Sequence, residues 1–403
     1  MRVNRVVVAL LCAAIASVAA ARNPRGGARP ATGGACAGGP ATSGTWVNIS
    51  PPAPGIGSAN YGIISMAIDP NNKAILYAVV DQQGMWRSTN CGSSWTLLGT
   101  PPATFPSSGN GYSTPYLDSP IEVLVDPADS THLVATQGVR GTALGFWISN
   151  NSGNTWYQSS GATGFFTIAA TTTNDVTELA TDPSNWNHMI LTGHSPWSGY
   201  SSSGVLETTD AGVTWTAHAP VGAWTSNTHL VAFLYDPATG QGNSQTWLVG
   251  DPTTAGFWKT TNSGTSWTQV STYLPIHGGQ NMLTYTANGT VFTGSAPYPI
   301  YSTDNGNTWA QVNSSGLDNF QYYYVGNDGS HLYALPGNAV MGSTGHVDPY
   351  YVTPTSTGSS SAWTQYNGGA QTFINGPFQM YWDSSNGLMY SAMWSAGLWV
   401  LKP

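Results

Sequence analysis

Charge is scarce in this sequence of 403 residues, and positive charge is scarcest. Charged residues make up 7% of the chain, whereas about a quarter is usual in a soluble domain. Beyond residue 43 the basic side chains are Arg87, Arg140 and three lysines, and the net charge of the chain is -8. So few basic residues cannot form a positive patch, which argues against a nucleic-acid partner.

Long apolar runs are also lacking, apart from the N-terminus. Residues 1–21 are predicted to be a signal peptide, because Arg2 and Arg5 precede an apolar core from Val6 to Ala16 and small residues follow. This core is shorter than the roughly 20 apolar residues of a membrane-spanning helix. We therefore expect a secreted, extracellular protein without a membrane partner. Residues 22–43, rich in Arg, Gly, Pro and Ala, are predicted to be a linker or pro-segment.

Cysteine is rare, with three residues in all. Cys12 leaves with the predicted signal peptide, so Cys36 and Cys91 remain. An even number of cysteines in an oxidising compartment favours a disulfide, and two free thiols are the alternative. Histidines, cysteines and carboxylates show no metal-ligand spacing, so we predict no metal site of that kind and no cofactor. A hard cation such as Ca²⁺ at the Asp-rich loops stays an open alternative.

Glycine and aromatic residues are abundant, and a turn motif recurs among them. The motif reads Ser/Thr-x-Asp/Asn-x-Gly-x-Ser/Thr-Trp. Asn or Asp can bond the local backbone and Gly supplies a positive φ, so each copy predicts a tight hairpin turn. The five copies, which we call the repeat turns, occupy residues 88–95, 149–156, 208–215, 260–267 and 302–309.

The repeat turn resembles the Asp-box, or BNR repeat, of secreted β-propellers such as sialidases, sortilin-type receptors and xyloglucanase-type glycoside hydrolases. Seven units of short strands follow one another at about 40–60 residues, a spacing typical of propellers. We predict an all-β fold over residues 44–403: a seven-bladed β-propeller with four-stranded blades. The last unit lacks a fourth strand, and residues 44–50 are predicted to supply it and close the ring. Cys36 precedes this closing strand and Cys91 lies in the first repeat turn, so their disulfide would secure the closure.

The face opposite the repeat turns is the predicted binding face, because it carries the longer and more aromatic loops. Aromatic rings can stack on sugars, and amides can bond their hydroxyl groups. The alternative is that these aromatics only cap the channel. The candidate substrate-binding residues are Tyr61, Gln83, Tyr112, Tyr116, Trp197, Trp224, Tyr298 and Trp394.

Two segments resemble the catalytic segments of xyloglucanase-type hydrolases. Residues 80–87 match the pattern Thr-Asp-x-Gly-Gly-x-Tyr-Arg in part, and residues 250–257 match Gly-Asp-x-Gly-Gly-Phe with two extra residues. The resemblance implies that Asp81 and Asp251 act as acid and base in an inverting hydrolysis. That family, however, places its carboxylates on two facing propellers, and this chain predicts one. Asp118 or Asp348 is therefore an alternative partner for Asp81.

The predicted function is cleavage of glycosidic bonds in a plant or microbial polysaccharide by a monomeric enzyme. The first alternative is a polysaccharide lyase that neutralises a uronate and removes a proton by β-elimination. Its candidate residues are Arg140, His194, His229 and His277, with Tyr112 or Tyr116. The second alternative is a carbohydrate-binding propeller, a lectin without catalysis. A sialidase is disfavoured, since sialidases bind the substrate carboxylate with three arginines. The predicted propeller contains two, Arg87 and Arg140.

Overall fold

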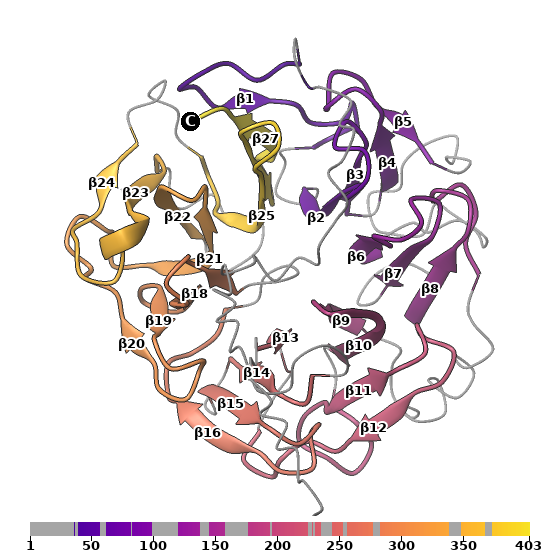
Figure 1. The fold of residues 1–403 in the computed structure, drawn as a ribbon, viewed down its shortest axis with the longest axis vertical. Coiled ribbons are helices and arrows are strands. Elements are labelled where there is room, and N and C mark those ends of the chain that lie inside the picture. Colours follow the sequence, from indigo (N-terminus) through magenta and orange to yellow (C-terminus); the bar gives the residue numbers. More distant parts are fainter. Residues whose placement is uncertain are drawn as a thin grey trace, which may run out of the picture.

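The computed structural model describes residues 36, 39–56, 62–81, 83–98, 120–137, 145–157, 176–193, 196–224, 228, 230–234, 244–252, 256–276, 283–337, 348–366 and 373–403. The predicted signal peptide and most of the predicted linker lie outside these residues. The described strands form seven antiparallel sheets, which stand as the blades of a ring (Figure 1). The predicted seven-bladed β-propeller is confirmed.

The first three blades follow one another along the chain from residue 63 to residue 218. Blade 1 contains β2 (Ile63–Ile68), β3 (Leu76–Val80), β4 (Gly84–Ser88) and β5 (Thr96–Leu97). Blade 2 contains β6 (Pro120–Val125), β7 (Leu133–Gln137) and β8 (Gly145–Ser149). Its outer edge in the described residues is a single bridge between Ile148 and Tyr157. Blade 3 contains β9 (Val176–Asp182), β10 (Asn185–Gly193), β11 (Val205–Thr208) and β12 (Thr216–His218).

The remaining four blades complete the ring. Blade 4 contains β13 (Leu230–Phe233), β14 (Trp247–Asp251), β15 (Gly256–Thr260) and β16 (Thr268–Ser271). Blade 5 contains β17 (Thr284–Tyr285), β18 (Val291–Thr293), β19 (Ile300–Ser302) and β20 (Ala310–Gln311). Blade 6 contains β21 (Gln321–Asn327), β22 (His331–Gly337), β23 (Tyr351–Pro354), the short 3-10 helix η1 (Thr355–Thr357) and β24 (Thr364–Gln365). Blade 7 contains β25 (Pro377–Asp383), β26 (Leu388–Met393), β27 (Gly397–Leu401) and β1 (Val47–Asn48).

The N-terminal strand completes the last blade, as predicted. In β1, Val47 pairs with Val400 and Asn48 pairs with Trp399 of β27. The preceding Trp46 is 2% exposed and stacks on Tyr350 of blade 6, with ring centroids 4.6 Å apart. The two ends of the chain therefore share one sheet, in which β1 pairs with and covers the edge of β27.

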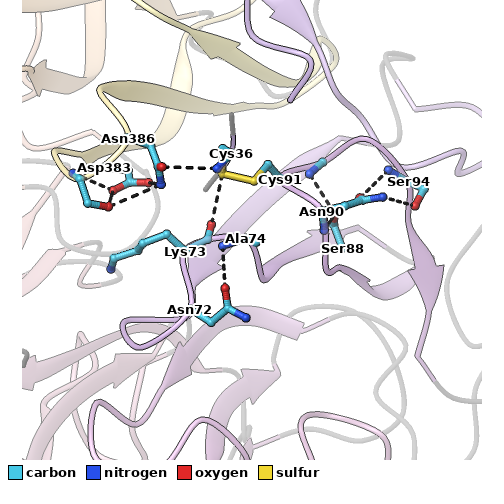
Figure 2. The surroundings of a disulfide bond; sticks show 12 residues. Cys36, Asn72, Lys73, Ala74, Ser88, Asn90, Cys91, Ser94, Asp383 and Asn386 are labelled. Atoms are coloured by element: carbon cyan, nitrogen blue, oxygen red, sulfur yellow. Dashed lines mark hydrogen bonds between the residues drawn. A yellow bond between two sulfur atoms is a disulfide. The ribbon is translucent and has the colours of Figure 1, made fainter. Parts of the chain in front are cut away.

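The predicted disulfide joins Cys36 to Cys91, whose Cα atoms are 5.7 Å apart. Cys91 lies in the repeat turn of blade 1, and the backbone N–H of Cys36 donates to Asn386 Oδ1 of blade 7 at 3.4 Å. Figure 2 shows this segment between the two blades. The disulfide thus links the closing segment to the first blade across the junction of the ring.

The repeat turns all have the same hydrogen bonds. In the copy at 302–309, Gly306 N donates to Ser302 Oγ at 2.8 Å and Thr308 N donates to Asp304 Oδ1 at 2.9 Å. Asn305 and Gly306 have φ values of 55° and 76°. A Cβ at Gly306 would also lie 2.9 Å from Leu234 Cδ1 in blade 4. Glycine is therefore required both by the turn and by the close approach of the neighbouring blade.

The repeat turns define one face of the ring, which we call the repeat-turn face. The opposite end of each blade, which we call the loop face, is where the described second strands end and the described third strands begin, as at Val80 and Gly84 in blade 1. The innermost strands line the centre of the ring (Figure 1). The hydrophobic core lies between adjacent blades, where apolar side chains of neighbouring sheets pack together.

Candidate functional site

The residues predicted to bind or cleave a substrate were assigned to the loop face from the sequence, and the structure describes half of them. Asp81, Gln83, Trp197, Trp224, Asp251, Tyr298, Asp348 and Trp394 are described. The others lie outside the described residues: Tyr61, Tyr112, Tyr116, Asp118, Arg140, His194, His229 and His277.

Asp81 and Asp251 are both buried at the loop-face end of a second strand. Asp81 directly follows β3, its backbone N–H donates to Gly62 O at 3.0 Å, and it is 1% exposed. Asp251 is the last residue of β14, pairs with Gly256 and is 0% exposed. The two carboxyl groups belong to blades 1 and 4, which blades 2 and 3 separate along the chain. The fold does not place them in neighbouring blades.

Asp348 precedes β23 and is buried in blade 6. Its backbone exchanges two hydrogen bonds with Phe373, at 3.1 and 2.8 Å. Phe373 in turn packs edge-on against Trp46 and Trp399. The position of Asp348 is therefore set by the junction between blades 6 and 7.

Gln83 lies in the same turn as Asp81 and is 0% exposed. Within the described residues, neither its Oε1 nor its Nε2 atom has a hydrogen-bond partner. A buried polar group without a partner costs about 1–3 kcal/mol. This amide is therefore a polar group at the loop face that a hydroxyl-bearing ligand could satisfy.

Trp224 and Trp394 differ from the prediction that they stack on sugar rings. Trp224 is 0% exposed and packs edge-on against Trp258 and Trp267, with centroids 6.4 and 5.3 Å away. Trp394 is 2% exposed and packs edge-on against Phe378 at 5.9 Å. Stacking needs an open ring face, and these two rings are covered by the core.

Trp197, Tyr200 and Tyr298 are the more accessible aromatic residues on this face. Tyr200 is 50% exposed, and its backbone N–H donates to Trp197 O at 2.9 Å. Trp197 is half-buried, because its ring packs over Gly204. Tyr298 is half-buried against the core between blades 5 and 6. The turn at 196–204 thus presents an exposed tyrosine beside a partly exposed tryptophan.

Two buried glutamates near the centre of the ring were not among the predicted residues. Glu122 lies on β6 and Glu178 on β9, at 0% and 2% exposure. Burial raises the pKa of Glu178 well above its usual value, and the negative charge of Glu122 raises it further. Glu122 lies four positions before Asp126, and Glu178 lies four positions before Asp182 in the next repeat. This shared spacing is the sequence signal that could have identified the two glutamates.

A second unpredicted cluster crosses blade 3, with one residue from each strand. His188 is 0% exposed, and its Nδ1 lies 3.0 Å from Asp182 Oδ2 while its Nε2 lies 2.9 Å from Glu207 Oε1. Glu207 Oε2 lies 2.9 Å from His218 Nε2. Burial opposes the ionisation of Glu207, but the hydrogen bonds from both histidines outweigh it and lower its pKa to about 2. The spacing from Asp182 to His188 repeats that from Asp126 to His132 in blade 2, so the sequence carried a signal for it.

The described residues contain no group of three or more His, Cys, Asp or Glu side chains arranged around a metal position. They also contain no helix with the length and apolarity that a membrane crossing requires. A shallow depression of about 220 Å³ lies on the repeat-turn face, lined by residues that include Lys259, Gln269 and Asn307. It is remote from the loop face.

Comparisons with solved structures support the β-propeller fold. No family model matches the chain, and no curated protein matches it. Among solved structures, an ancestral GH74 enzyme is similar over 86% of this chain and 45% of its own, with TM-score 0.56 and 17% identity. The GH74 xyloglucanase from Xanthomonas campestris is similar over 88% of this chain and 53% of its own, with TM-score 0.57 and 14% identity. The chain thus spans about half the length of these enzymes.

A single-propeller protein matches over nearly its whole length. YCF48 bound to D1 peptide is similar over 90% of this chain and 97% of its own, with TM-score 0.59 and 10% identity. Identities of 10–17% establish a shared β-propeller fold and leave the activity to the residues of this chain.

Proposed function

We propose that this chain is a secreted carbohydrate-active enzyme that hydrolyses glycosidic bonds of a polysaccharide, in the manner of a xyloglucanase. Asp81 is the proposed catalytic carboxyl group, and Asp251, Asp118 or Asp348 is its proposed partner. The polysaccharide would lie on the loop face, where the turn containing Trp197 and Tyr200 contributes aromatic surface.

The observation that carries this proposal is the place of Asp81 in the fold. It directly follows the second strand of blade 1 at the loop face, in a propeller that matches two GH74 structures over 86% and 88% of the chain. Its neighbour Gln83 adds a buried amide without a partner in the described residues, which suits recognition of a hydroxyl group.

An inverting hydrolysis needs a second carboxyl group about 6.5–9.5 Å from the first, with room for one water molecule between them. This chain covers 45% and 53% of the two GH74 structures. A partner on a second propeller is therefore replaced in this proposal by a carboxyl group on the same ring. Asp251 is proposed as this partner because its position in the repeat resembles that of Asp81. Asp251 is the last residue of the second strand of blade 4, and Asp81 directly follows the second strand of blade 1.

The test is a polysaccharide panel of xyloglucan, β-glucans, pectins and arabinogalactan-type gums. Each reaction is followed by reducing-sugar release and by ultraviolet absorbance of unsaturated uronates. We expect new reducing ends without absorbance for the wild type, and at least about a hundredfold loss of rate in Asp81→Asn. Asp304→Asn is the matched control, because the same position is Asn in the repeat turns at 88–95, 149–156 and 260–267.

Two results would contradict the hydrolase. Absorbance that rises together with reducing ends would show β-elimination and favour the uronate lyase. Full activity in both Asp81→Asn and Asp251→Asn would exclude these carboxyl groups as the catalytic pair.

A binding propeller without catalysis is the second candidate, because the propeller of YCF48 matches this chain over 97% of its own length. In that structure the propeller is bound to a peptide. Here the ligand proposed for such a role is a glycan, because charged residues are scarce in the sequence and Tyr200 is exposed. Polysaccharide binding in affinity electrophoresis, with neither reducing-sugar release nor ultraviolet absorbance, would support this candidate over the enzyme.

A further inference from the structure

Ser395 has a backbone conformation that is unusual for its place in the fold. It lies in the turn between β26 and β27, at the loop-face end of blade 7, and its φ is 61°. Ser395 therefore has a strained conformation outside the repeat turns. Strain of this kind occurs mainly at functional sites, where the surrounding structure maintains it. In the described residues, every other non-glycine residue with a positive φ occupies the fourth position of a repeat turn, namely Cys91, Ser152, Ala211, Ser263 and Asn305.

The hydroxyl group of Ser395 is buried without a partner. The residue is 6% exposed, and its Oγ atom has no hydrogen-bond partner within the described residues. Buried hydroxyl groups in folded proteins are usually hydrogen-bonded, because leaving one unpaired costs free energy. The strained backbone and the unpaired hydroxyl group thus occur in the same residue. Both are explained if this turn holds the hydroxyl group ready for a ligand that completes its hydrogen bonds.

Gly62 connects this turn to the turn that contains Asp81. Gly62 O accepts from Asp81 N at 3.0 Å, and a Cβ at Gly62 would lie 2.6 Å from Ser395 N and 2.7 Å from Trp394 Cα. The turns of blades 7 and 1 therefore contact the same glycine. A side chain at position 62 would overlap with the turn of blade 7. Ser395 thus lies beside the turn that carries the proposed catalytic carboxyl group.

Gln83 supplies a second unpaired polar group at this junction. It belongs to the same turn as Asp81, where its backbone N–H donates to Val80 O at 2.9 Å, and it is 0% exposed. Neither atom of its side-chain amide has a hydrogen-bond partner in the part of the chain that the structure describes. Gln83 and Ser395 come from different blades, so the two observations are independent. Two adjoining loop-face turns therefore each contain a buried polar side chain that the described fold does not satisfy.

The two groups have the chemistry of a site for a neutral sugar. A hydroxyl group can both donate and accept, and an amide supplies one acceptor and two donors. Neighbouring hydroxyl groups of a sugar ring present the complementary donors and acceptors. A uronate fits less well, because its carboxylate would meet the carboxyl group of Asp81.

The basic side chains that the structure describes have partners elsewhere. Lys73 donates to Tyr381, Arg87 to Ser152 and Lys259 to Asn305, at 3.3, 3.4 and 2.7 Å. Lys402 is exposed at the C-terminus. A carboxylate ligand would therefore find no described cation at the two turns, which favours a neutral sugar over a uronate.

We propose that Ser395 and Gln83 bind neighbouring hydroxyl groups of a neutral sugar unit, at a subsite on the loop face between blades 7 and 1. This inference rests on the glycan ligand of the proposed function, and it adds where the sugar beside Asp81 is held and that the sugar is uncharged. Ser395 and Gln83 are binding residues here, and Asp81 keeps its proposed catalytic role.

The experiment compares polysaccharide binding with stability in the full chain. The variants are Ser395→Ala and Gln83→Met, the second of which keeps a side chain of similar length without the amide. Affinity electrophoresis on xyloglucan, β-glucans, pectins and arabinogalactan-type gums measures binding, and thermal unfolding without polysaccharide measures stability. Each variant should weaken binding of a neutral polysaccharide about three- to tenfold, because a hydrogen-bonding group is lost. The unfolding temperature should stay unchanged or rise, since an unpaired buried polar group is removed.

Ser302→Ala is the matched control. Ser302 is 1% exposed, but its Oγ accepts from Gly306 N at 2.8 Å in a repeat turn on the opposite face. Loss of this paired hydroxyl group should lower the unfolding temperature and leave polysaccharide binding unchanged. The opposite pattern in Ser395→Ala distinguishes a ligand-binding hydroxyl group from a structural one. For a polysaccharide that is hydrolysed, Ser395→Ala should raise KM with little change in kcat.

Unchanged binding in both variants would overturn the inference, and a lowered unfolding temperature would then show that the two groups serve the fold. Tighter binding of pectin than of neutral polysaccharides by wild type would overturn it as well. If wild type binds a neutral polysaccharide without releasing reducing sugars, only the hydrolase is contradicted, and the variants still decide the subsite. If Gln83→Met does not fold, Ser395→Ala decides it alone. A wild type that binds no member of the panel would overturn both proposals.

Discussion

Glu207 Oε1 lies 2.9 Å from His188 Nε2 inside blade 3, and this contact makes the stability of the blade depend on pH. Burial opposes the charged form of His188, but hydrogen bonds to Asp182 and Glu207 outweigh it and raise its pKa above 6.5. Asp182 also accepts from Ser244 N at 2.6 Å, which extends the cluster to blade 4. A charged imidazole between two carboxylates therefore fixes one blade against the next.

The stabilisation should be greatest between about pH 4.5 and 6.5, the ordinary pKa values of the two groups. The pKa of Glu207 is lowered to about 2, so its contribution is complete above pH 4.5 and is lost as the pH falls toward 2. The pKa of His188 is raised, so its contribution is complete below pH 6.5 and is lost as the pH rises through the raised value.

Glu207→Gln should therefore lower the unfolding temperature most within that window. The expected loss in the free energy of unfolding is on the order of 1–2 kcal/mol, reduced from the full pKa shift because Glu207 is partly screened by solvent. Thermal unfolding measured across pH checks this, with His331→Gln as a control whose side chain is 50% exposed. A difference between wild type and Glu207→Gln that does not vary with pH would contradict the assignment.

Gly306→Ala should destabilise the ring more than Gly289→Ala, although both positions have a positive φ, 76° and 83°. A Cβ at Gly306 would meet Leu234 Cδ1 at 2.9 Å, whereas a Cβ at Gly289 meets no atom within 4 Å. We expect a loss of about 1 kcal/mol for Gly289→Ala from backbone strain alone. Gly306→Ala should lose about 2–4 kcal/mol, because overpacking adds to the strain. Chemical denaturation of both variants measures the difference, and equal losses would show that blade contact at the repeat turn has no role.

Loss of the disulfide should weaken the closure of the ring. The bond joins residues 55 positions apart, and such cross-links usually stabilise by about 2–4 kcal/mol. We expect Cys91→Ser to lower the unfolding temperature, and dithiothreitol to lower that of wild type to a similar value while leaving Cys91→Ser unchanged. Titration of thiols in the unreduced, unfolded protein is the control. Two free thiols there would exclude the bond.

The fold could be predicted because its signals are local. A repeat turn is set by eight consecutive residues, such as 302–309, and its hydrogen bonds join Ser302, Asp304 and Gly306 within that span. The closing strand followed from the missing fourth strand of blade 7, and β1 pairs with β27 as expected. The partners Cys36 and Cys91 followed from the same closure.

The candidate site could be predicted only in part, because it depends on contacts between blades. Trp224 was assigned to the loop face from its place in a connection, but Trp258 and Trp267 cover its ring. Glu122 and Glu178 lie within apolar strand segments, and their alignment depends on the register of β6 and β9, which no single segment reveals. The cluster of His188 with Glu207 joins two successive strands of blade 3, and the contact depends on the register in which β10 pairs with β11.

The contrast between Trp224 and Tyr200 separates structural aromatics from ligand-binding ones. Trp224 is 0% exposed among Trp258 and Trp267, so Trp224→Ala should lower the free energy of unfolding by about 3–5 kcal/mol. Tyr200 is 50% exposed, so Tyr200→Ala should change the free energy of unfolding by less than about 0.5 kcal/mol.

If the loop face binds a glycan, Tyr200→Ala should instead weaken polysaccharide binding several-fold, because a stacking ring is lost, while Tyr157→Ala should not. Tyr157 is a matched control at 47% exposure on the outer edge of blade 2. Affinity electrophoresis on the polysaccharide panel, combined with denaturation, measures both quantities for each variant. Equal binding by wild type and Tyr200→Ala would place the glycan away from the turn at 196–204.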